Sequence, residues 1–418
     1  MARGPVIALV DGEHHPSAVR SALDHLAADR GLAGVVFCGG EEKAGRVVLE
    51  SAEEHYGHPV TIEPDPGEAL RRLAGGGNAQ AVVDLADEPV LPPAAKLRLA
   101  ALALHLGLPY EAPGLRLTPP HFDHVDFAGP KLSVIGTRKR TGKTAVAGHW
   151  AGLLRDAGVP PVIVSMGRGG PAEPQLAGAD TALDALMQIA AEGRHAASDY
   201  LEDAALARVP SVGSRRVGGG LAGEPFESNF LAGAALAASL SPAALVFEGS
   251  GSCIPPVHAD RTVCVVGDRE SALTHLGSYR LLRADLALVM DPDPTLRADV
   301  AALSKGPALS CALRPEPAEA LPGGARVAVF STSDSPVSGI DAVVASPNLA
   351  RRSALDADLQ RAAAERCDVY LTELKAAAID TVARHAVTTG ARVIFLRNVP
   401  SALDADLDAE LMELYRSV

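Results

Sequence analysis

The stretch LSVIGTRKRTGKTAVAG, residues 132–148, decides how the rest of the chain is interpreted. Its first four residues form a short apolar run, which predicts a buried strand. A loop over residues 136–142 follows, and Lys143 and Thr144 lead into a predicted helix. A strand, a glycine-containing loop, Gly-Lys-Thr and a helix are the context that a phosphate-binding P-loop requires. The stretch therefore predicts a nucleotide phosphate site and not a chance match.

Each part of this loop has a predicted role toward phosphate. Backbone N–H groups of the loop and of the helix start point into one concavity, where they bind phosphate oxygens. Lys143 places a point charge on the transferring phosphoryl group, and the Thr144 hydroxyl is placed to ligate Mg²⁺. The predicted nucleotide-binding residues are Gly136, Thr137, Thr141, Gly142, Lys143, Thr144 and Ala145.

The spacing of the loop departs from the common Gly-x-x-x-x-Gly-Lys-Thr motif. That motif needs glycine at position 137, where this chain has Thr137 preceded by Gly136. The form G-T-x-x-x-x-G-K-T resembles the branch of P-loop enzymes that contains dethiobiotin synthetase and cobyrinate amidase. The non-functional alternative, a chance GKT sequence in a surface loop, does not account for the flanking strand and helix.

Composition limits the classes of function. The 418 residues are enough for two or three domains, and the formal net charge of −13 argues against general binding to nucleic acid or anionic membranes. No stretch approaches the length of a membrane span. Five dispersed cysteines without a C-x-x-C pair indicate reduced thiols in a cytoplasmic protein. An anionic ligand therefore needs a local basic cluster, which the loop provides through Arg138, Lys139, Arg140 and Lys143.

Apolar runs alternate with helical patterns along the chain, which predicts α/β domains with mostly parallel sheets. Residues 1–128 are expected to form a Rossmann-like domain, whose predicted strand ends carry Asp11, Glu13 and His14. A proline-containing stretch at 112–130 shows little periodicity and predicts a linker. A P-loop NTPase domain with helices flanking a parallel sheet is expected over 129–345.

Residues 346–418 are expected to form a C-terminal α/β segment that packs on the NTPase domain. The segment ends in SALDADLDAELMELYRSV, which predicts an acidic amphipathic helix. Its predicted apolar face consists of Leu403, Leu407, Leu411 and Leu414.

Two predicted strand ends in the NTPase domain carry further site candidates. Glu248 follows the apolar run at 243–247, and an acid at this place is where a P-loop enzyme holds Mg²⁺. We therefore predict that Thr144 and Glu248 are the metal ligands. Arg168 lies in the glycine-rich loop after the run at 162–165 and is predicted to reach a phosphate; a tight turn without a ligand is the alternative.

Two more cationic segments allow alternative interpretations. Arg215 and Arg216 precede the glycine run at 218–220, and two arginines beside such a run suit an anion nest; a flexible surface loop with solvated arginines fits equally. Lys375 is either a ligand residue or part of a solvated helix face. The cations predicted to act on transferring or substrate phosphates are Lys143, Arg168, Lys139, Arg138 and Arg215.

Segments spread over nearly the whole chain resemble the cyclic 2,3-diphosphoglycerate synthetase family. The P-loop and the EGSG segment occur in wider P-loop families, whereas three other segments are more diagnostic. These are GRGGPAEP, GRHAASDYLEDA and LTELKAAA. VDGEHHP, DLADEPVL, GGGLAG and GSYRLLRADL contribute to the same resemblance.

The resemblance implies an ATP- and Mg²⁺-dependent ligase. Such an enzyme joins the two phosphates of 2,3-diphosphoglycerate in an intramolecular phosphoanhydride and releases ADP and phosphate. A homodimer with a small-molecule substrate is also implied. Two alternatives stay open: a related ATP-dependent kinase or amidoligase acting on another anionic metabolite, and a non-catalytic nucleotide switch.

Overall fold

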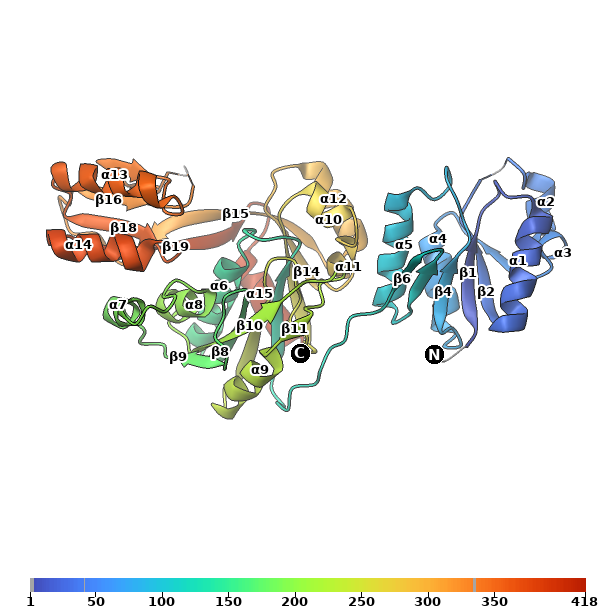
Figure 1. Cartoon of the computed structure of the whole chain (residues 1–418), viewed down its shortest axis with the longest axis horizontal. Coiled ribbons are helices and arrows are strands. Elements are labelled where there is room, and N and C mark those ends of the chain that lie inside the picture. Colours follow the sequence, from blue (N-terminus) through green and yellow to red (C-terminus); the bar gives the residue numbers. More distant parts are fainter. Residues whose placement is uncertain (1–3, 41, 334–335) are drawn as a thin grey trace. The chain divides into compact units, whose positions relative to one another are not determined.

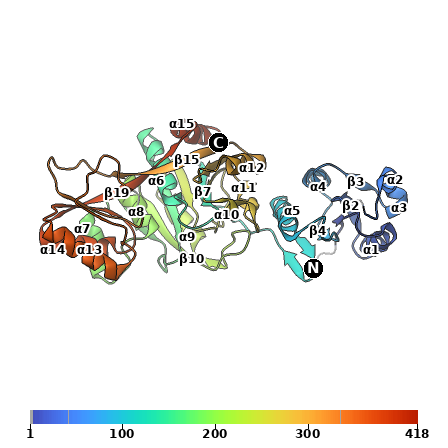
Figure 2. The same ribbon diagram turned by 90° about the horizontal axis from the view of Figure 1, so that it is seen from above.

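The computed structural model describes residues 4–40, 42–333 and 336–418. Contacts divide the chain into two units, whose elements are labelled in Figures 1 and 2. One unit comprises Met1–His121 and Arg269–Arg283, and the other comprises Phe122–Asp268 and Ala284–Val418. Each unit is built on its own sheet with helices packed against it. The predicted α/β class, with a parallel-sheet N-terminal domain before a P-loop domain, is confirmed.

The sheet of the first unit has the order β3-β2-β1-β4-β5-β6. β1, β2, β3, β4 and β5 pair in parallel, and β6 adds an antiparallel edge. The strands are β1 (Val6–Val10), β2 (Leu32–Phe37), β3 (Val60–Ile62), β4 (Ala81–Asp84), β5 (Tyr110–Ala112) and β6 (Leu115–Leu117). The helices are α1 (Pro16–Asp29), α2 (Arg46–Glu50), α3 (Ala52–Tyr56), α4 (Pro66–Gly75), α5 (Pro93–His105), α10 (Arg269–Leu273) and α11 (Ser278–Leu281).

The sheet of the second unit has the order β11-β10-β8-β12-β7-β13-β14-β15-β19-β18-β16-β17, with β9 paired to β10. The strands up to β14 are β7 (Lys131–Gly136), β8 (Pro161–Gly167), β9 (Gln175–Ala177), β10 (Ser211–Val217), β11 (Glu227–Ser228), β12 (Ala244–Glu248), β13 (Arg261–Val266) and β14 (Leu286–Val289). The later strands are β15 (Ala308–Pro317), β16 (Val327–Phe330), β17 (Val344–Ser346), β18 (Val369–Glu373) and β19 (Arg392–Ala402). β10, β8, β12, β7, β13 and β14 are parallel, so their carboxyl ends share one edge.

Two long strands connect this P-loop sheet to the C-terminal strands within the second unit. β15 pairs in parallel with β14 at its start and antiparallel with β19 over Cys311–Pro317. Figure 1 shows β15 and β19 running side by side toward β16 and β18. The helices of this unit are α6 (Lys143–Asp156), α7 (Leu183–Ala191), α8 (Asp199–Ala207), α9 (Phe230–Ser239), α12 (Pro294–Leu303), α13 (Arg352–Ala364), the π-helix η1 (Ala378–Ala383), α14 (Arg384–Thr389) and α15 (Leu407–Arg416).

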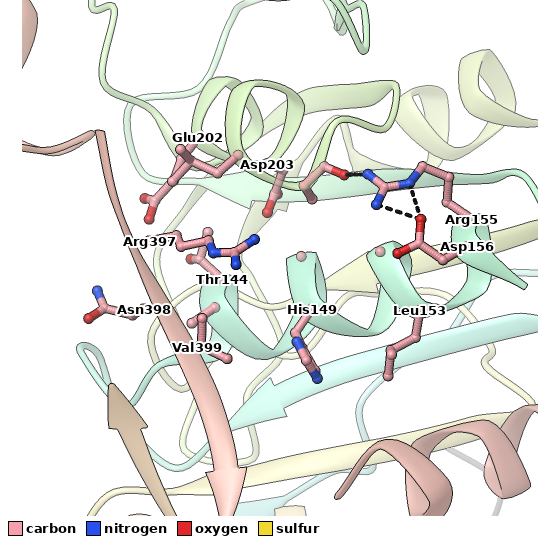
Figure 3. A pocket seen from close by; sticks show the side chains of 15 residues that line it. Thr144, His149, Leu153, Arg155, Asp156, Glu202, Asp203, Arg397, Asn398 and Val399 are labelled. Carbon is pink, nitrogen blue, oxygen red and sulfur yellow. Dashed lines mark hydrogen bonds and ion pairs between the residues drawn. The ribbon is translucent and has the colours of Figure 1, made fainter. Parts of the chain in front are cut away.

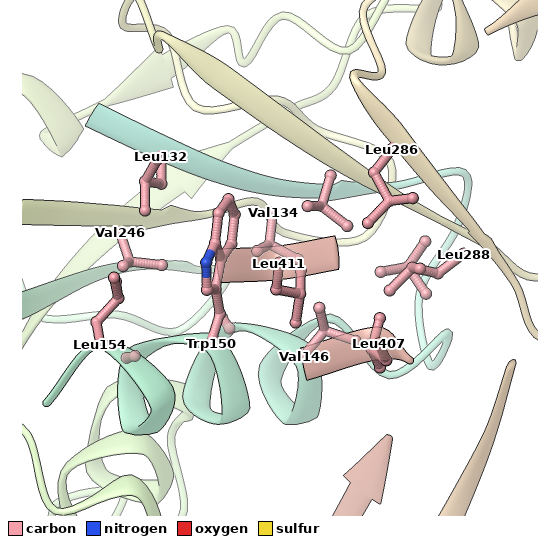
Figure 4. Packing of buried hydrophobic residues seen from close by; sticks show 14 of the residues in the cluster. Leu132, Val134, Val146, Trp150, Leu154, Val246, Leu286, Leu288, Leu407 and Leu411 are labelled. Atoms are coloured by element: carbon pink, nitrogen blue, oxygen red, sulfur yellow. The ribbon is translucent and has the colours of Figure 1, made fainter. Parts of the chain in front are cut away.

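Aliphatic layers on both faces hold the P-loop sheet in place. On one face Trp150 of α6 and Leu411 of α15 pack against Leu132 and Val246 of the sheet, as Figure 4 shows. On the other face Phe230 of α9 packs with Phe247 of β12 in an edge-to-face contact. Because burial of each large apolar side chain contributes about 1.5–3 kcal/mol, these layers fix the strand ends that carry the site.

The structure changes several details of the predicted organisation. The boundary proposed at 345/346 falls inside β17, which pairs through β16 with β18. Residues 269–283 join the first unit, although the proposed division placed them in the NTPase domain. The hairpin strand β6 lies within the predicted linker. Pairing across long sequence separations explains these differences, since local periodicity does not report it.

The C-terminal helix begins later than predicted. Leu407 and Leu411 of α15 are buried in the core, as expected for its apolar face. Leu403 precedes the helix and is 67% exposed, because Asp406 provides the N-cap by accepting a hydrogen bond from the Ala409 N–H. Leu403 is therefore not part of the apolar face.

The described ranges contain no helix of the length and apolarity needed to cross a membrane.

Candidate functional site

The phosphate-binding loop joins β7 to α6, as the sequence predicts. Gly142 is the residue before the helix and has φ of 97°, a left-handed conformation that favours glycine. A side chain at Gly136 would lie 2.9 Å from both Lys143 Cδ and Thr141 Oγ1, so only glycine leaves room there. The two glycines therefore let the loop close tightly around the lysine side chain.

Lys143 lies beneath the loop and is buried. Its Nζ donates a hydrogen bond to the Arg138 carbonyl at 3.0 Å. Burial lowers the pKa of Lys143, and the negative charges of Glu248 and Asp199 oppose that effect. The ammonium group is thus held in place by one loop carbonyl, a partner that a nucleotide phosphate can replace.

A chain of short hydrogen bonds connects the loop to the neighbouring strands. Thr144 Oγ1 donates to Glu248 Oε1 at 2.6 Å. Ser165 Oγ lies 2.8 Å from Glu248 Oε2 and 2.7 Å from Asp203 Oδ2. Glu248 ends β12, Ser165 lies near the end of β8, and Asp203 comes from α8. Three elements thus place two carboxylates at the mouth of the P-loop.

These two carboxylates are short of hydrogen-bond donors. Ser165 has one hydroxyl proton, so it donates to Glu248 or Asp203 but not to both. Asp203 Oδ1 is buried and has no hydrogen-bond partner among the described residues. Burial, followed by the charge of Asp199, raises the pKa of Glu248 to about 8; burial and the charge of Glu248 raise the pKa of Asp203. The pair therefore retains a proton at neutral pH or needs a cation.

This donor set fits Mg²⁺. A hydroxyl and a carboxylate are hard oxygen ligands, and Mg²⁺ is usually held by one or two protein groups together with water and substrate phosphates. Among the described residues no three His, Cys, Asp or Glu side chains gather into a metal-binding group. The orphaned Asp203 oxygen and the raised pKa values of Asp203 and Glu248 indicate that a cation beside Thr144 would stabilise this edge.

A second set of acids lies on α8, next to the P-loop. Lys375 Nζ lies 3.4 Å from Glu202 Oε1. Burial raises the pKa of Glu202 to about 7, and the charge of Lys375 opposes the shift. Burial also raises the pKa of Asp199, while the charges of Lys375 and Lys143 lower it. Asp199 is therefore close enough to interact with both lysines.

Lys375 does not lie on a helix face. It follows β18 and precedes Ala376, which has φ of 49°, and η1 begins two residues later. The interpretation of Lys375 as part of a solvated helix is wrong because the ion pair with Glu202 holds it at a turn, beside the acids of α8.

A cavity of about 240 Å³ runs along α6, between α8 and β19 (Figure 3). Thr144, Glu202, Asp203 and Arg397 gather at one end of it in Figure 3, and Arg155 and Asp156 pair at the other. Asn398 and Val399 of β19 complete the wall. The end that holds Thr144 and Asp203 adjoins the phosphate loop, so the cavity continues the site along the helix.

The other predicted cations lie around the loop and the sheet edge. Arg138 is exposed and pairs with Asp268 at 2.9 Å, and Lys139 is exposed. Arg168 is exposed beyond the end of β8, close enough to Lys143 for repulsion between their charges. Arg215 is exposed and lies on β10, not in a glycine-rich nest. The roles of all four toward phosphate stay predictions.

Three family models match successive parts of the chain. They describe the N-terminal, P-loop and C-terminal domains of cyclic 2,3-diphosphoglycerate synthetase and match residues 5–118, 131–302 and 328–399. A cyclic 2,3-diphosphoglycerate synthetase from Rubrobacter xylanophilus is 42% identical, and the match covers 98% of this chain and 96% of that protein. The chain belongs to the cyclic 2,3-diphosphoglycerate synthetase family. The resemblance found in the sequence is confirmed.

A second relative carries the same enzyme name. A cyclic 2,3-diphosphoglycerate synthetase from Thermococcus kodakarensis is 35% identical, with 99% of this chain and 98% of that protein covered. The chain is therefore an enzyme, and the alternative of a non-catalytic switch is rejected. Among solved structures, LpxK from Aquifex aeolicus in complex with ATP shares 13% identity and a TM-score of 0.40, over 71% of this chain and 90% of that one.

Sequence reasoning missed two residues at the carboxyl edge of the P-loop sheet and left a third, Arg216, out of the predicted phosphate-binding cations. Ser165 and Asp203 complete the chain to Glu248, and Arg216 is buried on β10 beside the exposed Arg215. Asp203 lies in GRHAASDYLEDA, a segment that marks the family, and this was the only signal for it. Nothing in the local pattern distinguishes Arg216 from Arg215, because the glycines that follow suggested a loop.

The strand-end residues of the first unit have internal roles. Asp11 Oδ1 accepts hydrogen bonds from the Glu13 and His14 N–H groups, and its Oδ2 accepts one from the Asp87 N–H. His14 Nδ1 also lies 2.9 Å from Asp11 Oδ1. These contacts show Asp11 and His14 holding the loop after β1.

Proposed function

We propose that this synthetase uses ATP and Mg²⁺ to close 2,3-diphosphoglycerate into its cyclic form, with release of ADP and phosphate. The observation that carries the proposal is the contact of 2.6 Å between Thr144 and Glu248, directly beside the buried Lys143 of the P-loop. This arrangement supports phosphoryl transfer from a metal-bound nucleotide. The names of the relatives support the choice of substrate.

The reaction needs two displacements at phosphorus. An oxygen of one substrate phosphate attacks the γ-phosphorus of ATP, the bond to the β-phosphate oxygen breaks, and ADP leaves. The substrate then carries a diphosphate on one carbon and a phosphate on the other. An oxygen of that phosphate attacks the inner phosphorus of the diphosphate and expels the outer group as inorganic phosphate. The product holds one new phosphoanhydride within a ring.

The chain's residues act by neutralising charge and fixing position. Lys143 exchanges the Arg138 carbonyl for a nucleotide phosphate and stabilises the charge on the transferring group. Thr144 and Glu248 would hold Mg²⁺, which when bound offsets negative charge on the nucleotide phosphates. Arg168, close to Lys143 at the same sheet edge, is proposed to neutralise substrate phosphate. Arg138, Lys139 and Arg215 are proposed for the same task.

The proposal is tested by incubating the purified chain with ATP, Mg²⁺ and 2,3-diphosphoglycerate and following phosphorus resonances by NMR. We expect a cyclic diphosphate to appear with one ADP and one phosphate per ring. Folded protein that binds ATP but forms no ring would overturn the proposal. ATP turnover stimulated by a different anionic metabolite would favour a related kinase or amidoligase instead.

A homodimer and a cytoplasmic location are further proposals, both taken from the family resemblance and the cysteine pattern. Light scattering of the purified protein is expected to give twice the chain mass of 43.0 kDa. Scattering at the mass of one chain would contradict the dimer.

A further inference from the structure

Arg216 is a buried cation with no acidic partner among the described residues. It is 7% exposed, and its guanidinium donates only to main-chain carbonyls, from Nη1 to Gly218 at 2.5 Å and from Nη2 to Ser250 at 2.9 Å. Its Nε is buried and has no hydrogen-bond partner within the described ranges. Arginine is seldom buried without a paired anion, because desolvating the charge is costly. The position therefore lacks an anion.

A second arginine faces the same point. A side chain on Gly251 would begin 3.0 Å from Arg168 Nη2 and 3.4 Å from Arg216 Nη2. Within the described chain Arg168 makes no hydrogen bond or ion pair of its own. Burial lowers the pKa of Arg216, the nearby Cys253 opposes this, and the positive charge of Arg168 lowers it further. Two guanidinium groups thus converge on Gly251 although they repel each other.

The pair lies beside the P-loop in a definite order along the sheet. β12, which carries Glu248, lies between β7 and β8, and β10 lies beyond β8. Neighbouring strands are about 4.8 Å apart, so the carboxyl ends of β8 and β10 are roughly 10 and 14 Å from that of the P-loop strand. The proposed metal ligand Glu248 therefore separates the loop from the two arginines.

We propose that Arg168 and Arg216 together bind one phosphate of the diphosphoglycerate, on the far side of Glu248 from the P-loop. The inference rests on the proposed function and specifies its acceptor site. A phosphate dianion balances two guanidinium charges and accepts their forked N–H groups in pairs. The nucleotide's terminal phosphate lies at Lys143, so a phosphate at the arginine pair belongs to the acceptor.

The strand geometry assigns this role to Arg216 over Arg215. Side chains alternate between the two faces of β10, and Arg216 is buried where Arg215 is exposed. Ser250, whose carbonyl fixes Arg216, follows Glu248 by two residues in the same loop. The loop after β12 thus carries the proposed metal ligand and also orients the phosphate-binding arginine.

The test compares Arg216→Met and Arg168→Met with two further single replacements of arginine. Arg215→Met removes the neighbouring exposed charge on β10. Arg416→Met removes a charge near the end of α15, where Arg416 pairs only weakly with Glu413 at 3.7 Å. Methionine keeps the approximate volume of arginine. The KM for 2,3-diphosphoglycerate, the KM for ATP and the melting temperature are measured for each protein.

We expect Arg216→Met and Arg168→Met to raise the KM for diphosphoglycerate by about 10- to 100-fold, the loss of one charge-assisted contact. The KM for ATP should change less than threefold, and the melting temperature of Arg216→Met should be unchanged or higher. Arg416→Met should behave as the unmodified chain, and Arg215→Met should change the KM at least fivefold less than Arg216→Met.

An unchanged KM for diphosphoglycerate in Arg216→Met, or equal increases for ATP and diphosphoglycerate, would overturn the inference. If Arg216→Met did not fold, the exposed Arg168→Met would decide by the same criterion. Calorimetric titration of 2,3-diphosphoglycerate into the unmodified and variant proteins without ATP separates this inference from the proposed function. Binding that is lost in the variants supports the arginine site even if no ring forms, and binding that persists rejects it.

Discussion

The two sheets of the molecule carry acids at their carboxyl ends in opposite states. In the first unit Asp84 is buried and accepts hydrogen bonds from Lys96, Tyr110 and the Ala86 N–H. In the second unit α8 brings Asp203 to this edge, where one of its oxygens has no hydrogen-bond partner in the described part of the chain. Asp203 and Glu248 there share the single Ser165 proton. The acid at the first edge thus has all its hydrogen-bond donors from neighbouring residues, whereas the acids at the second edge lack donors.

The pKa values of the acids at the two edges shift in opposite directions. In the first unit burial alone would raise the pKa of Asp11, but hydrogen bonds from the His14 and Asp87 backbone N–H groups lower it below its usual value. Burial raises the pKa of Glu248 to about 8 in the second. Since buried polar groups are costly unless paired, the unsatisfied edge is the one that a ligand would stabilise. Strand-end acids alone therefore do not identify a site, whereas their missing partners do.

The largest expected effect comes from Lys143→Met at the unsatisfied edge. Removal of the charge at the transferring phosphoryl should lower kcat for ring formation by about 1,000-fold. The melting temperature should be unchanged or higher, because a buried ammonium with one carbonyl partner is replaced by an apolar group. Phosphorus NMR and thermal unfolding measure the two effects, and ring formation at the normal rate would contradict the role of the lysine.

Glu248→Gln should separate the metal role from folding. The amide keeps hydrogen-bonding contacts to Thr144 and Ser165 but loses the negative charge that a cation needs. We expect kcat to fall about 100-fold or more and the Mg²⁺ concentration for half-maximal rate to rise, with stability unchanged or higher. Rates measured over a Mg²⁺ series test this, and an unaltered Mg²⁺ dependence would remove Glu248 from the metal site.

Asp84→Asn provides the matched replacement at the satisfied edge. It leaves Lys96, whose side chain is 26% exposed, without its charged partner and weakens the Tyr110 contact of 2.5 Å. The first unit should lose about 2–3 kcal/mol of unfolding free energy, somewhat less than for a fully buried pair. Calorimetry should show an earlier transition, with kcat unchanged below it. A loss of activity without destabilisation would contradict the purely structural role of Asp84.

The smallest expected effect is a dependence of stability on pH. Both Glu248, with a pKa of about 8, and Glu202, with a pKa of about 7, lie above the usual 4.5, so the folded chain binds more protons than the unfolded chain between these limits. Their contribution is complete below pH 4.5 and is lost as the pH rises through 7 and 8. The melting temperature without Mg²⁺ should fall by about 3 °C or more between pH 6 and 8.5.

Glu248→Gln is the control for this measurement. Because glutamine does not titrate, the melting temperature of the variant should fall less between pH 6 and 8.5 than that of the unmodified chain. Mg²⁺ with ADP should stabilise the unmodified chain more at pH 8.5 than at pH 6, because a bound cation favours the ionised carboxylates. A melting temperature that rises over this range would contradict the raised pKa values.

Local sequence patterns were sufficient for the strand, loop and helix around Lys143 and for the α/β class. The same patterns placed an acid at the end of β12, where the structure brings Glu248 to Thr144. They failed where the partner lies far away in the chain. β15 and β19 pair over residues about 90 positions apart, with Cys311 opposite Ala402. Prolines 315 and 317 argue against a strand at β15, because proline is rare inside a sheet.

The site shows the same limit at the level of single residues. Ser165 and Asp203 lie 83 and 45 positions before Glu248. The parallel pairing of β8 with β12 places Ser165 beside Glu248, and the packing of α8 on the sheet brings Asp203 to both. Arg215 and Arg216 are chemically identical and adjacent, so their separation depends on which face of β10 is buried. To predict which of the two arginines is buried, one must know that residues 214–217 form a strand. The glycines that follow them indicate a loop instead.

The chain has a single tryptophan, Trp150, which is fully buried on α6 six residues beyond Thr144. Its indole packs against β7 and β12, the strands that lead to the P-loop and to Glu248 (Figure 4). All tryptophan emission from this protein thus originates from α6, the helix that follows the P-loop. Any rearrangement of that helix on loading with ligand is accessible to intrinsic fluorescence, without labelling or a second chromophore to subtract.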